Sequence, residues 1–246
     1  MSLPREERLK VLGLWPGWRP RSTRSLARGV EPEPREAETI IGCAEGATPA
    51  GDIANLDWPA LEQAIRACTR CELHRGRTQG VVGVGDIHAD WLIIGEAPGA
   101  DEDRMGEPFV GQAGKLLDAM LAAIGLKRGE NVYIANVLKS RPPRNRDPKP
   151  EEVAACLPYL ERQIDLIRPR LIVAMGRFAA QSLLLTDTAI GRLRGQVHEY
   201  RGVPLLITYH PAYLLRNPAD KAKAWEDLLL ARATMGRLQS AAPAAP

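Results

Sequence analysis

The chain has 246 residues, of which 45 % are hydrophobic, and it carries a formal net charge of +3. This length and apolar content suffice for one α/β domain with a substantial core. No apolar run approaches the roughly 18 residues of a membrane span, so a membrane protein is excluded. The N-terminus lacks the apolar stretch and cleavage site of a signal peptide, and we therefore expect a cytoplasmic, reducing location.

Residues 1–55 are expected to form a flexible, basic, proline-rich extension. Stretches such as "EPEPREAE" are too polar to bury a core. Trp15 and Trp18 lie beside arginines, which would suit docking of this arm on an unknown partner or on the main domain, although a loosely ordered tail is the favoured interpretation. At the other end, residues 237–246 are expected to be a disordered Ala/Pro tail.

The segment between these ends, residues 56–236, is regular and is expected to be one domain. Apolar periodicity predicts a helix at 58–68, strands at 91–95, 131–138, 171–176 and 203–211, and helices at 114–126, 150–167, 177–185 and 219–235. Strands that alternate with helices favour a parallel sheet covered on both faces. We therefore predict a three-layer α/β/α sandwich with a central, mainly parallel four-stranded sheet.

An acidic, glycine-rich stretch, "GEAPGADEDRMGEPFVG" at 95–111, follows the first of these strands. Its glycines permit close approach of the backbone to a ligand. Carboxylates such as Glu96 and Glu102 suit the positioning of water or the stabilisation of a cationic sugar. Phe109 suits either core packing or stacking on a base. A nucleotide-dependent enzyme is disfavoured, because a dinucleotide site requires G-x-G-x-x-G here and few carboxylates.

Polar residues also follow two other predicted strands. Asn136 lies near the end of the second strand, and His210 near the end of the last. Because ligands bind outside the carboxyl ends of parallel strands, we expect one site at this edge. A basic cluster follows Asn136 and suits a phosphate backbone, with a solvated loop as the alternative interpretation. It comprises Lys139, Arg141, Arg144, Arg146 and Lys149.

Three long motifs make the sequence recognisable. "GEAPGADEDRMGEPFVGQAGKLLD", "NVLKSRPPRNR" and "HPAYLLRNP", in this order and spacing, closely resemble the family 4 uracil-DNA glycosylases. These are bacterial and archaeal repair enzymes that carry a [4Fe-4S] cluster. The resemblance covers about 60–232. It implies a monomer that flips uracil out of single- or double-stranded DNA, hydrolyses its N-glycosidic bond and leaves an abasic site.

The resemblance also implies roles for the residues of the acidic loop and the second strand. Glu96 and Ala97, with Glu102 further along, occupy the water-activating motif. Phe109 would stack on the extruded uracil, and Asn136 would hydrogen-bond its O4 and N3 edge. Such an amide discriminates against cytosine, because the wrong base leaves polar groups unpaired.

The last motif and the basic loop complete the implied site. His210 would stabilise negative charge on uracil O2, and Leu214 or Leu215 would wedge the base stack open. An arginine in the same motif, Arg216, would contact the phosphates. The basic loop would add further phosphate contacts from Arg141, Arg144 and Arg146.

Three cysteines match the positions of cluster ligands in the family. They are Cys68, Cys71 and Cys156, and the fourth ligand position holds Ser140. A zinc site would need a fourth ligand, and no histidine is placed to supply it. Ser140 ligating as an alkoxide, Cys43 replacing it, an open iron, or no cluster at all are the alternatives, besides cysteines that simply pack in the core. We expect a [4Fe-4S] cluster with Ser140 beside the fourth iron.

Two further functions compete with catalysis. One is covalent trapping on uracil-DNA through a histidine in an inserted basic loop, but "SRPPRNRDPKP" has neither histidine nor insertion. The other is a catalytically inactive DNA-binding protein. A pure binder would not need Glu96, Glu102, Asn136 and His210 together, which favours the active enzyme.

Overall fold

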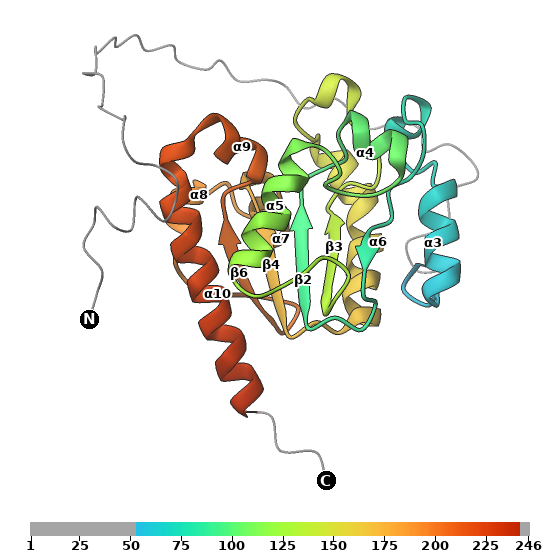
Figure 1. Cartoon of the computed structure of the whole chain (residues 1–246). Helices are drawn as coiled ribbons and strands as arrows, with labels where there is room; N and C mark the ends of the chain where they lie inside the picture. The colour runs from blue at the N-terminus through green and yellow to red at the C-terminus, as the bar shows by residue number, and fades with distance from the viewer. Residues whose placement is uncertain (1–52, 242–246) are drawn as a thin grey trace, which may run out of the picture. The chain divides into compact units, whose positions relative to one another are not determined.

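The computed structural model describes residues 53–241, and within them six strands form one sheet (Figure 1). The strand order is β1-β3-β2-β4-β6-β5, in which the four inner strands are parallel and the two edge strands antiparallel. The four-stranded parallel sheet predicted from the sequence is confirmed for these inner strands. The edge strands are too short to leave a periodic pattern. The strands are β1 (Val84–Gly85), β2 (Trp91–Gly95), β3 (Val132–Asn136), β4 (Leu171–Met175), β5 (His198–Tyr200) and β6 (Val203–Thr208).

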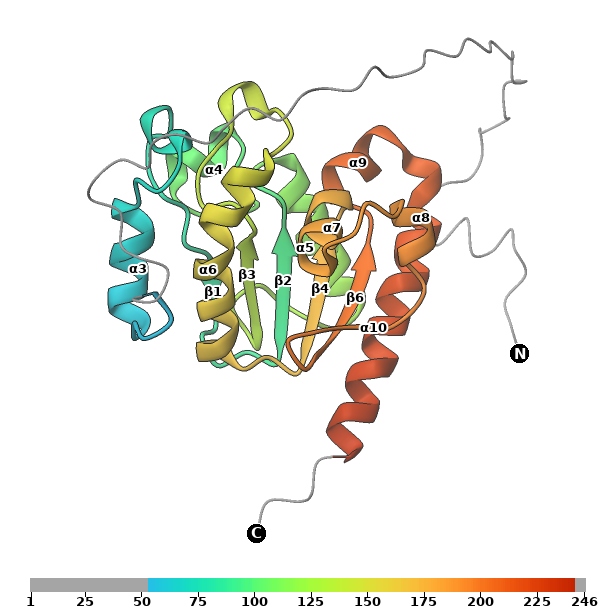
Figure 2. The ribbon, with the colours of Figure 1, turned by 180° about the vertical axis from the view of Figure 1, so that it is seen from behind.

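Alternating residues of the inner strands enter two separate cores, which is why these strands are apolar throughout. Ile93 and Val173 pack in one core, and Leu92 and Ile94 pack in the other. Helices α5 and α10 cover the first face and α6 and α7 the second (Figures 1 and 2). The three-layer sandwich is therefore confirmed. The four helices are α5 (Gln112–Ala123), α6 (Pro150–Ile167), α7 (Arg177–Leu184) and α10 (Lys221–Ala241).

A third, smaller core lies beside α6, under helix α3 (Trp58–Ala67). The side chain of Asp57 caps α3 by accepting the N–H of Ala60 at 3.0 Å. Ile53 packs in this core with no exposed surface, so the domain begins at least three residues before the predicted boundary at 56.

The C-terminal boundary is also corrected, because α10 continues to Ala241 rather than ending at 236. Trp15, Trp18 and Cys43 lie outside the described residues. Within residues 53–241, no helix has the length and apolar character needed to cross a bilayer.

Short helices occupy the connections that leave the carboxyl ends of the strands. The stretch at 95–111, which the sequence suggested was a loop, contains α4 (Ala100–Met105). A second short helix, α9 (Pro211–Arg216), begins directly after His210. Figure 1 shows α4 and α9 beyond the arrowheads of the central strands. The remaining short elements are η1 (Glu72–Arg75), η2 (Pro143–Asn145), α8 (Ile190–Leu193) and η3 (Pro218–Asp220).

Candidate active site

A cleft of about 870 Å³ opens at the carboxyl ends of the parallel strands β2, β3, β4 and β6. It is lined by the four connections that follow these strands. This volume is in the range of small-molecule sites. The cleft contains the predicted residues Glu96, Phe109, Asn136 and His210. Residues that are more than a hundred positions apart in sequence therefore meet in one site, as the rule for parallel sheets predicts.

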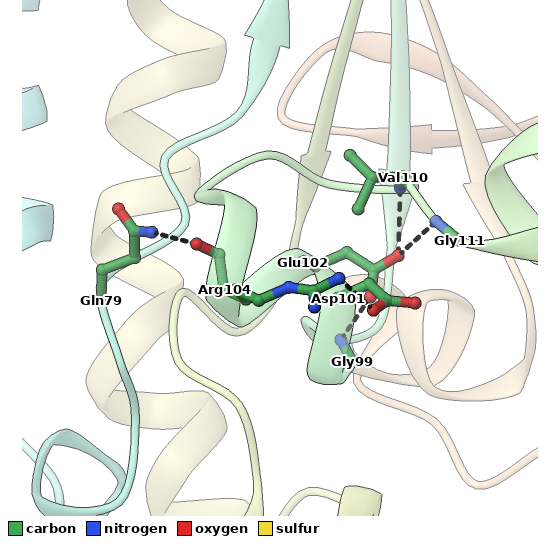
Figure 3. A network of polar contacts seen from close by, with 7 residues as sticks. All are labelled: Gln79, Gly99, Asp101, Glu102, Arg104, Val110 and Gly111. Carbon is green, nitrogen blue, oxygen red and sulfur yellow. Dashed lines mark hydrogen bonds and ion pairs between the residues drawn. The ribbon is translucent and has the colours of Figure 1, made fainter.

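Glu102 shapes the loop that carries Phe109 (Figure 3). One carboxylate oxygen accepts the N–H of Gly99 at 3.1 Å, and the other accepts those of Val110 at 3.1 Å and Gly111 at 3.2 Å. Both oxygens are thus occupied by backbone amides from the two ends of the loop. These contacts tie the Glu102 carboxylate to the backbone of the loop, and its predicted part in activating water stays a prediction.

Glycine at the end of β2 allows two side chains to crowd over the backbone. The register of the sheet pairs Gly95 with Asn136, whose side chain is buried. A Cβ at Gly95 would lie 2.3 Å from the Asn136 Oδ1 and 2.6 Å from the Phe109 ring. Contacts this short are impossible for a side chain. The absence of a side chain at Gly95 therefore sets the positions of the amide and the ring.

His210 is held as a neutral hydrogen-bond donor. Its Nδ1 accepts the backbone N–H of Ala212 at 3.1 Å, which places the ring proton on Nε2. Removal from water, and secondarily the charge of Arg216, lowers the pKa of His210 to about 4. The ring also stacks on Phe109, with centroids 5.3 Å apart and planes inclined by 26°. Near pH 7 the imidazole therefore carries no charge and presents its Nε2–H.

Glu96 lies in the same cleft, and its pKa is raised whereas that of His210 is lowered. Burial, and secondarily the negative charge of Asp147, raises the pKa of Glu96 to about 7, while Arg177 opposes the shift. Arg177 and Asp147 pair with each other at 3.2 Å. A carboxyl with a pKa near the working pH is suited to act as a general base.

Lys139 is not part of a DNA-facing surface, contrary to the sequence interpretation of the basic cluster. Its side chain is only 1 % exposed. The ammonium donates to the carbonyl of Asn136 at 2.8 Å and to Oε1 of Gln163 at 2.6 Å. Burial lowers the pKa of Lys139 to about 7. Lys139 thus fastens the end of β3 to helix α6.

The arginines of the basic loop differ in their availability. Arg146 donates both arms of its guanidinium to the buried carboxylate of Glu152, which offsets its charge. Arg141 donates to the side chain of Asn145 at 2.7 Å, and Arg144 is exposed. Arg141 and Arg144 are therefore better placed than Arg146 to meet an external anion.

Leu214 and Leu215, the two residues predicted as alternatives for opening the base stack, differ in exposure on helix α9. Leu214 is 1 % exposed and packs in the main core, whereas Leu215 is 44 % exposed. Arg216 follows at the end of the helix and lines the cleft. Of the two leucines, only Leu215 presents an apolar side chain to a partner.

Two of the three predicted cysteine ligands, Cys71 and Cys156, pack in one small core beside the basic loop, and Cys68 packs on the neighbouring core under α3. Cys71 packs against Cys156, and the hydrogen bond between their sulfurs contributes most to lowering the pKa of Cys71, to about 6. The Cys68 and Cys156 sulfurs each accept a backbone N–H at 3.5 Å, from Arg70 and Lys139 respectively.

The predicted fourth position, Ser140, lies beside the same loop. Its hydroxyl accepts from Arg77 at 2.6 Å, and Arg77 also donates to the carbonyl of Cys68 at 2.9 Å. Among residues 53–241, no three His, Cys, Asp or Glu side chains are close enough to hold a single metal ion. Thiolate sulfurs are the usual protein ligands of iron–sulfur clusters, so the chemistry of three of these four donors suits such a group.

Comparison with known proteins agrees with this geometry. Residues 82–229 match the family model described as "Uracil DNA glycosylase superfamily". The chain is 53 % identical over 166 residues to a type-4 uracil-DNA glycosylase of Archaeoglobus fulgidus, covering 64 % of this chain and 83 % of the relative. It is 43 % identical over 183 residues to that of Pyrobaculum aerophilum, covering 71 % and 93 %. The chain belongs to the family 4 uracil-DNA glycosylases. The resemblance stated from the motifs is thereby confirmed.

Two residues of this family 4 site were missed by sequence reasoning. Asp147 and Arg177 flank Glu96, and Arg177 follows the end of β4. The residues predicted from the sequence follow three of the four parallel strand ends, and none of them follows the fourth, at Gly176. The rule that every such strand end can contribute to a site would have pointed to Arg177.

Gly95→Ala should disable the site while leaving the sheet intact. The added Cβ must displace the Asn136 amide and the Phe109 ring, and a misplacement of about 1 Å costs on the order of a hundredfold in rate. We expect a loss of this size in single-turnover uracil release, with unchanged DNA affinity. Gly191→Ala is the matched control, because nothing lies within 4 Å of its Cβ position. Uracil release by Gly95→Ala at the wild-type rate would contradict the close contacts of Asn136 and Phe109 with the Gly95 backbone.

Proposed function

We propose that this chain excises uracil from DNA by hydrolysing the N-glycosidic bond, which leaves an abasic site. Membership in family 4 supports the activity. The observation that carries it is the presence of a neutral His210 donor and the buried Asn136 amide in one cleft. Uracil offers a carbonyl oxygen to each of them.

Binding requires the base to leave the duplex, because the glycosidic bond is inaccessible inside the stack. Leu215 fills the space that the base leaves, and Phe109 provides a surface on which the extruded uracil stacks. The Asn136 amide pairs with O4 and N3 of uracil. Cytosine carries an amine at the O4 position, so it would leave this buried amide wrongly paired.

The chemical step separates charge, and the cleft stabilises both products. As the bond between C1′ and N1 breaks, its electron pair moves onto uracil, and the Nε2–H of His210 donates to O2, where negative charge gathers. The sugar becomes an oxocarbenium-like cation. Glu96 accepts a proton from the water that attacks C1′; Glu96 then loses a proton to solvent, and the uracil anion takes one from solvent at N1, so one water is consumed in all.

The same proposal assigns the contacts to DNA outside the cleft. Arg141 and Arg144 from the basic loop and Arg216 from α9 would neutralise phosphates, with a smaller part for Arg146 because Glu152 already pairs with it. The chain would act as a monomer on single- or double-stranded DNA. Docking of the N-terminal arm on a partner remains a prediction.

We further propose that Cys68, Cys71 and Cys156 hold a [4Fe-4S] cluster with Ser140 at its fourth corner. The contact of Cys71 with Cys156 and the electrostatic effect of Cys68 on Cys156 support this assignment. The cluster would be structural and would link the segment after α3 to the basic loop. Arg77 would favour an anionic Ser140 oxygen by donating a hydrogen bond to it. Thiolate ligands require a reducing environment, so the proposal includes a cytoplasmic location.

Uracil release should depend on pH through Glu96. Because the carboxyl must be ionised to accept a proton, the single-turnover rate on a dU-containing oligonucleotide should rise as pH passes through about 7, the pKa of Glu96. Asp147→Asn should move this midpoint to lower pH, since it removes a negative charge that raises the pKa of Glu96. Asp187→Asn, an exposed residue outside the cleft, is the control.

The same assay separates this function from its alternatives. An active glycosylase releases free uracil without an added cofactor. A covalent complex with DNA that survives denaturation would instead indicate the trapping branch. Tight binding without release would indicate an inactive binder, and either outcome would overturn the proposed hydrolysis.

The two loop arginines should differ in their effect on DNA binding. Arg144→Ala should reduce the slope of log affinity against log salt by about one unit, since one phosphate contact is lost. Arg146→Ala should change the slope less and should instead lower the midpoint of urea unfolding, because it leaves the Glu152 carboxylate unpaired. Equal salt slopes for Arg144→Ala and wild type would mean that Arg144 faces solvent only.

The cluster can be tested without an activity assay. Anaerobically purified protein should be brown, with a broad visible absorption band and about four irons per chain. Ser140→Cys should slow the loss of this band in air, because thiolate binds iron better than oxygen does. Cys156→Ala should abolish the band, and Cys43→Ala should leave it unchanged. A colourless, iron-free protein that still releases uracil would contradict the cluster and leave the glycosylase assignment standing.

A further inference from the structure

Arg128 reaches back from the turn after α5 to the loop that carries Phe109. Its Nε donates to Oδ1 of Asp118 on α5 at 2.9 Å. Its two terminal nitrogens donate to the carbonyls of Pro108 at 3.0 Å and Phe109 at 2.9 Å. The side chain is 22 % exposed. One guanidinium thus links the turn, helix α5 and the two peptide units that precede and follow Phe109 Cα.

The Phe109 backbone needs such support. Its φ of 56° lies in the left-handed region, which is uncommon for a residue other than glycine. Its carbonyl also lies so close to α5 that a Cβ at Gly114 would be 1.7 Å from the oxygen. The loop therefore adopts this conformation only while contacts from outside it hold the backbone in place.

Glu102 accepts hydrogen bonds from the N–H groups of this backbone, and Arg128 donates hydrogen bonds to its carbonyl groups. The carboxylate of Glu102 accepts the N–H groups of Val110 and Gly111, as Figure 3 shows. The guanidinium of Arg128 donates to the carbonyls of Pro108 and Phe109. Together they fix the peptide units on both sides of Phe109, and with them the ring that stacks on His210.

We propose that Arg128 is a positioning residue for uracil excision, which acts by fixing the Phe109 ring at the angle needed to stack on the extruded base. This inference rests on the proposed function. Arg128 is not among the residues that line the cleft, so its effect must pass through Phe109. The planar guanidinium of arginine can donate to two carbonyls and a carboxylate at the same time. The ammonium of lysine is a compact charge and cannot reproduce this arrangement of donors.

The expected effect is on the rate of the chemical step and not on DNA binding. Loss of Arg128 frees the Phe109 backbone, and misplacement of a substrate-positioning group costs about 10- to 100-fold in rate. Phosphate contacts supply most of the DNA affinity, and Arg128 makes none of those proposed above. Arg128→Ala should therefore lower the single-turnover rate by this factor with unchanged Kd for DNA.

A double-mutant cycle with Phe109→Ala tests whether the effect passes through the ring. The wild type, Arg128→Ala, Phe109→Ala and the double variant are compared in single-turnover uracil release. If Arg128 acts through Phe109, Arg128→Ala should change the rate less than about twofold once the ring is gone. An undiminished effect of Arg128→Ala in the Phe109→Ala background would overturn the proposal.

Two further variants separate positioning from a general loss of structure. Lys127→Ala removes the neighbouring cation, whose exposed side chain pairs with Glu130 at the surface, and should release uracil at the wild-type rate. Arg128→Lys keeps the charge but loses the fork, so its rate should stay near that of Arg128→Ala while its urea midpoint stays near that of wild type. Full recovery by lysine would contradict a forked contact. Failure of the wild-type chain to release uracil would instead refute the proposed function.

Discussion

The active site depends on two strand ends that carry no side chain. At Gly95 the space that a Cβ would occupy is taken by the Asn136 amide and the Phe109 ring, and at Gly176 a Cβ would lie 2.8 Å from that of His210. The groups proposed to read the base and to stabilise the leaving group thus pack directly on the main chain of β2 and on the residue after β4. Their separation is therefore set by the register of the sheet rather than by flexible loops.

Burial shifts the pKa values of Glu96 and His210 in opposite directions but has one common result. It raises the pKa of Glu96 and lowers the pKa of His210, so each group is pushed towards its uncharged form. Near pH 7 the imidazole is neutral and can donate to the uracil anion, while Glu96 is partly ionised and can accept a proton. The cleft is thus prepared for charge that appears only in the transition state, which is the arrangement that accelerates a reaction most.

The sequence predicted the inner strands and the residues at their ends, because a buried parallel strand is a short apolar run and polar residues directly after it stand out. It did not predict the burial of Lys139, since lysine usually indicates solvent and only the tertiary fold supplies Gln163 as its partner. Leu214 and Leu215 have the same chemistry and differ only in their direction on a short helix. Helix α4 was missed because it is only six residues long and its first turn depends on Glu102.

Helix α9 has a mechanical consequence. His210 is its N-cap residue and Leu215 lies in its last turn, so the group proposed to contact uracil and the group proposed to enter the DNA belong to one helix of six residues and its cap. Leu214 anchors this piece in the core, and Tyr213 donates a hydrogen bond to Asp220 at 2.6 Å. With the proposed roles, a base pair that resists Leu215 also keeps its base away from His210. The enzyme would then respond first to how easily a base pair opens and only afterwards to which base it holds. Well-stacked DNA would be rejected at the first of these steps.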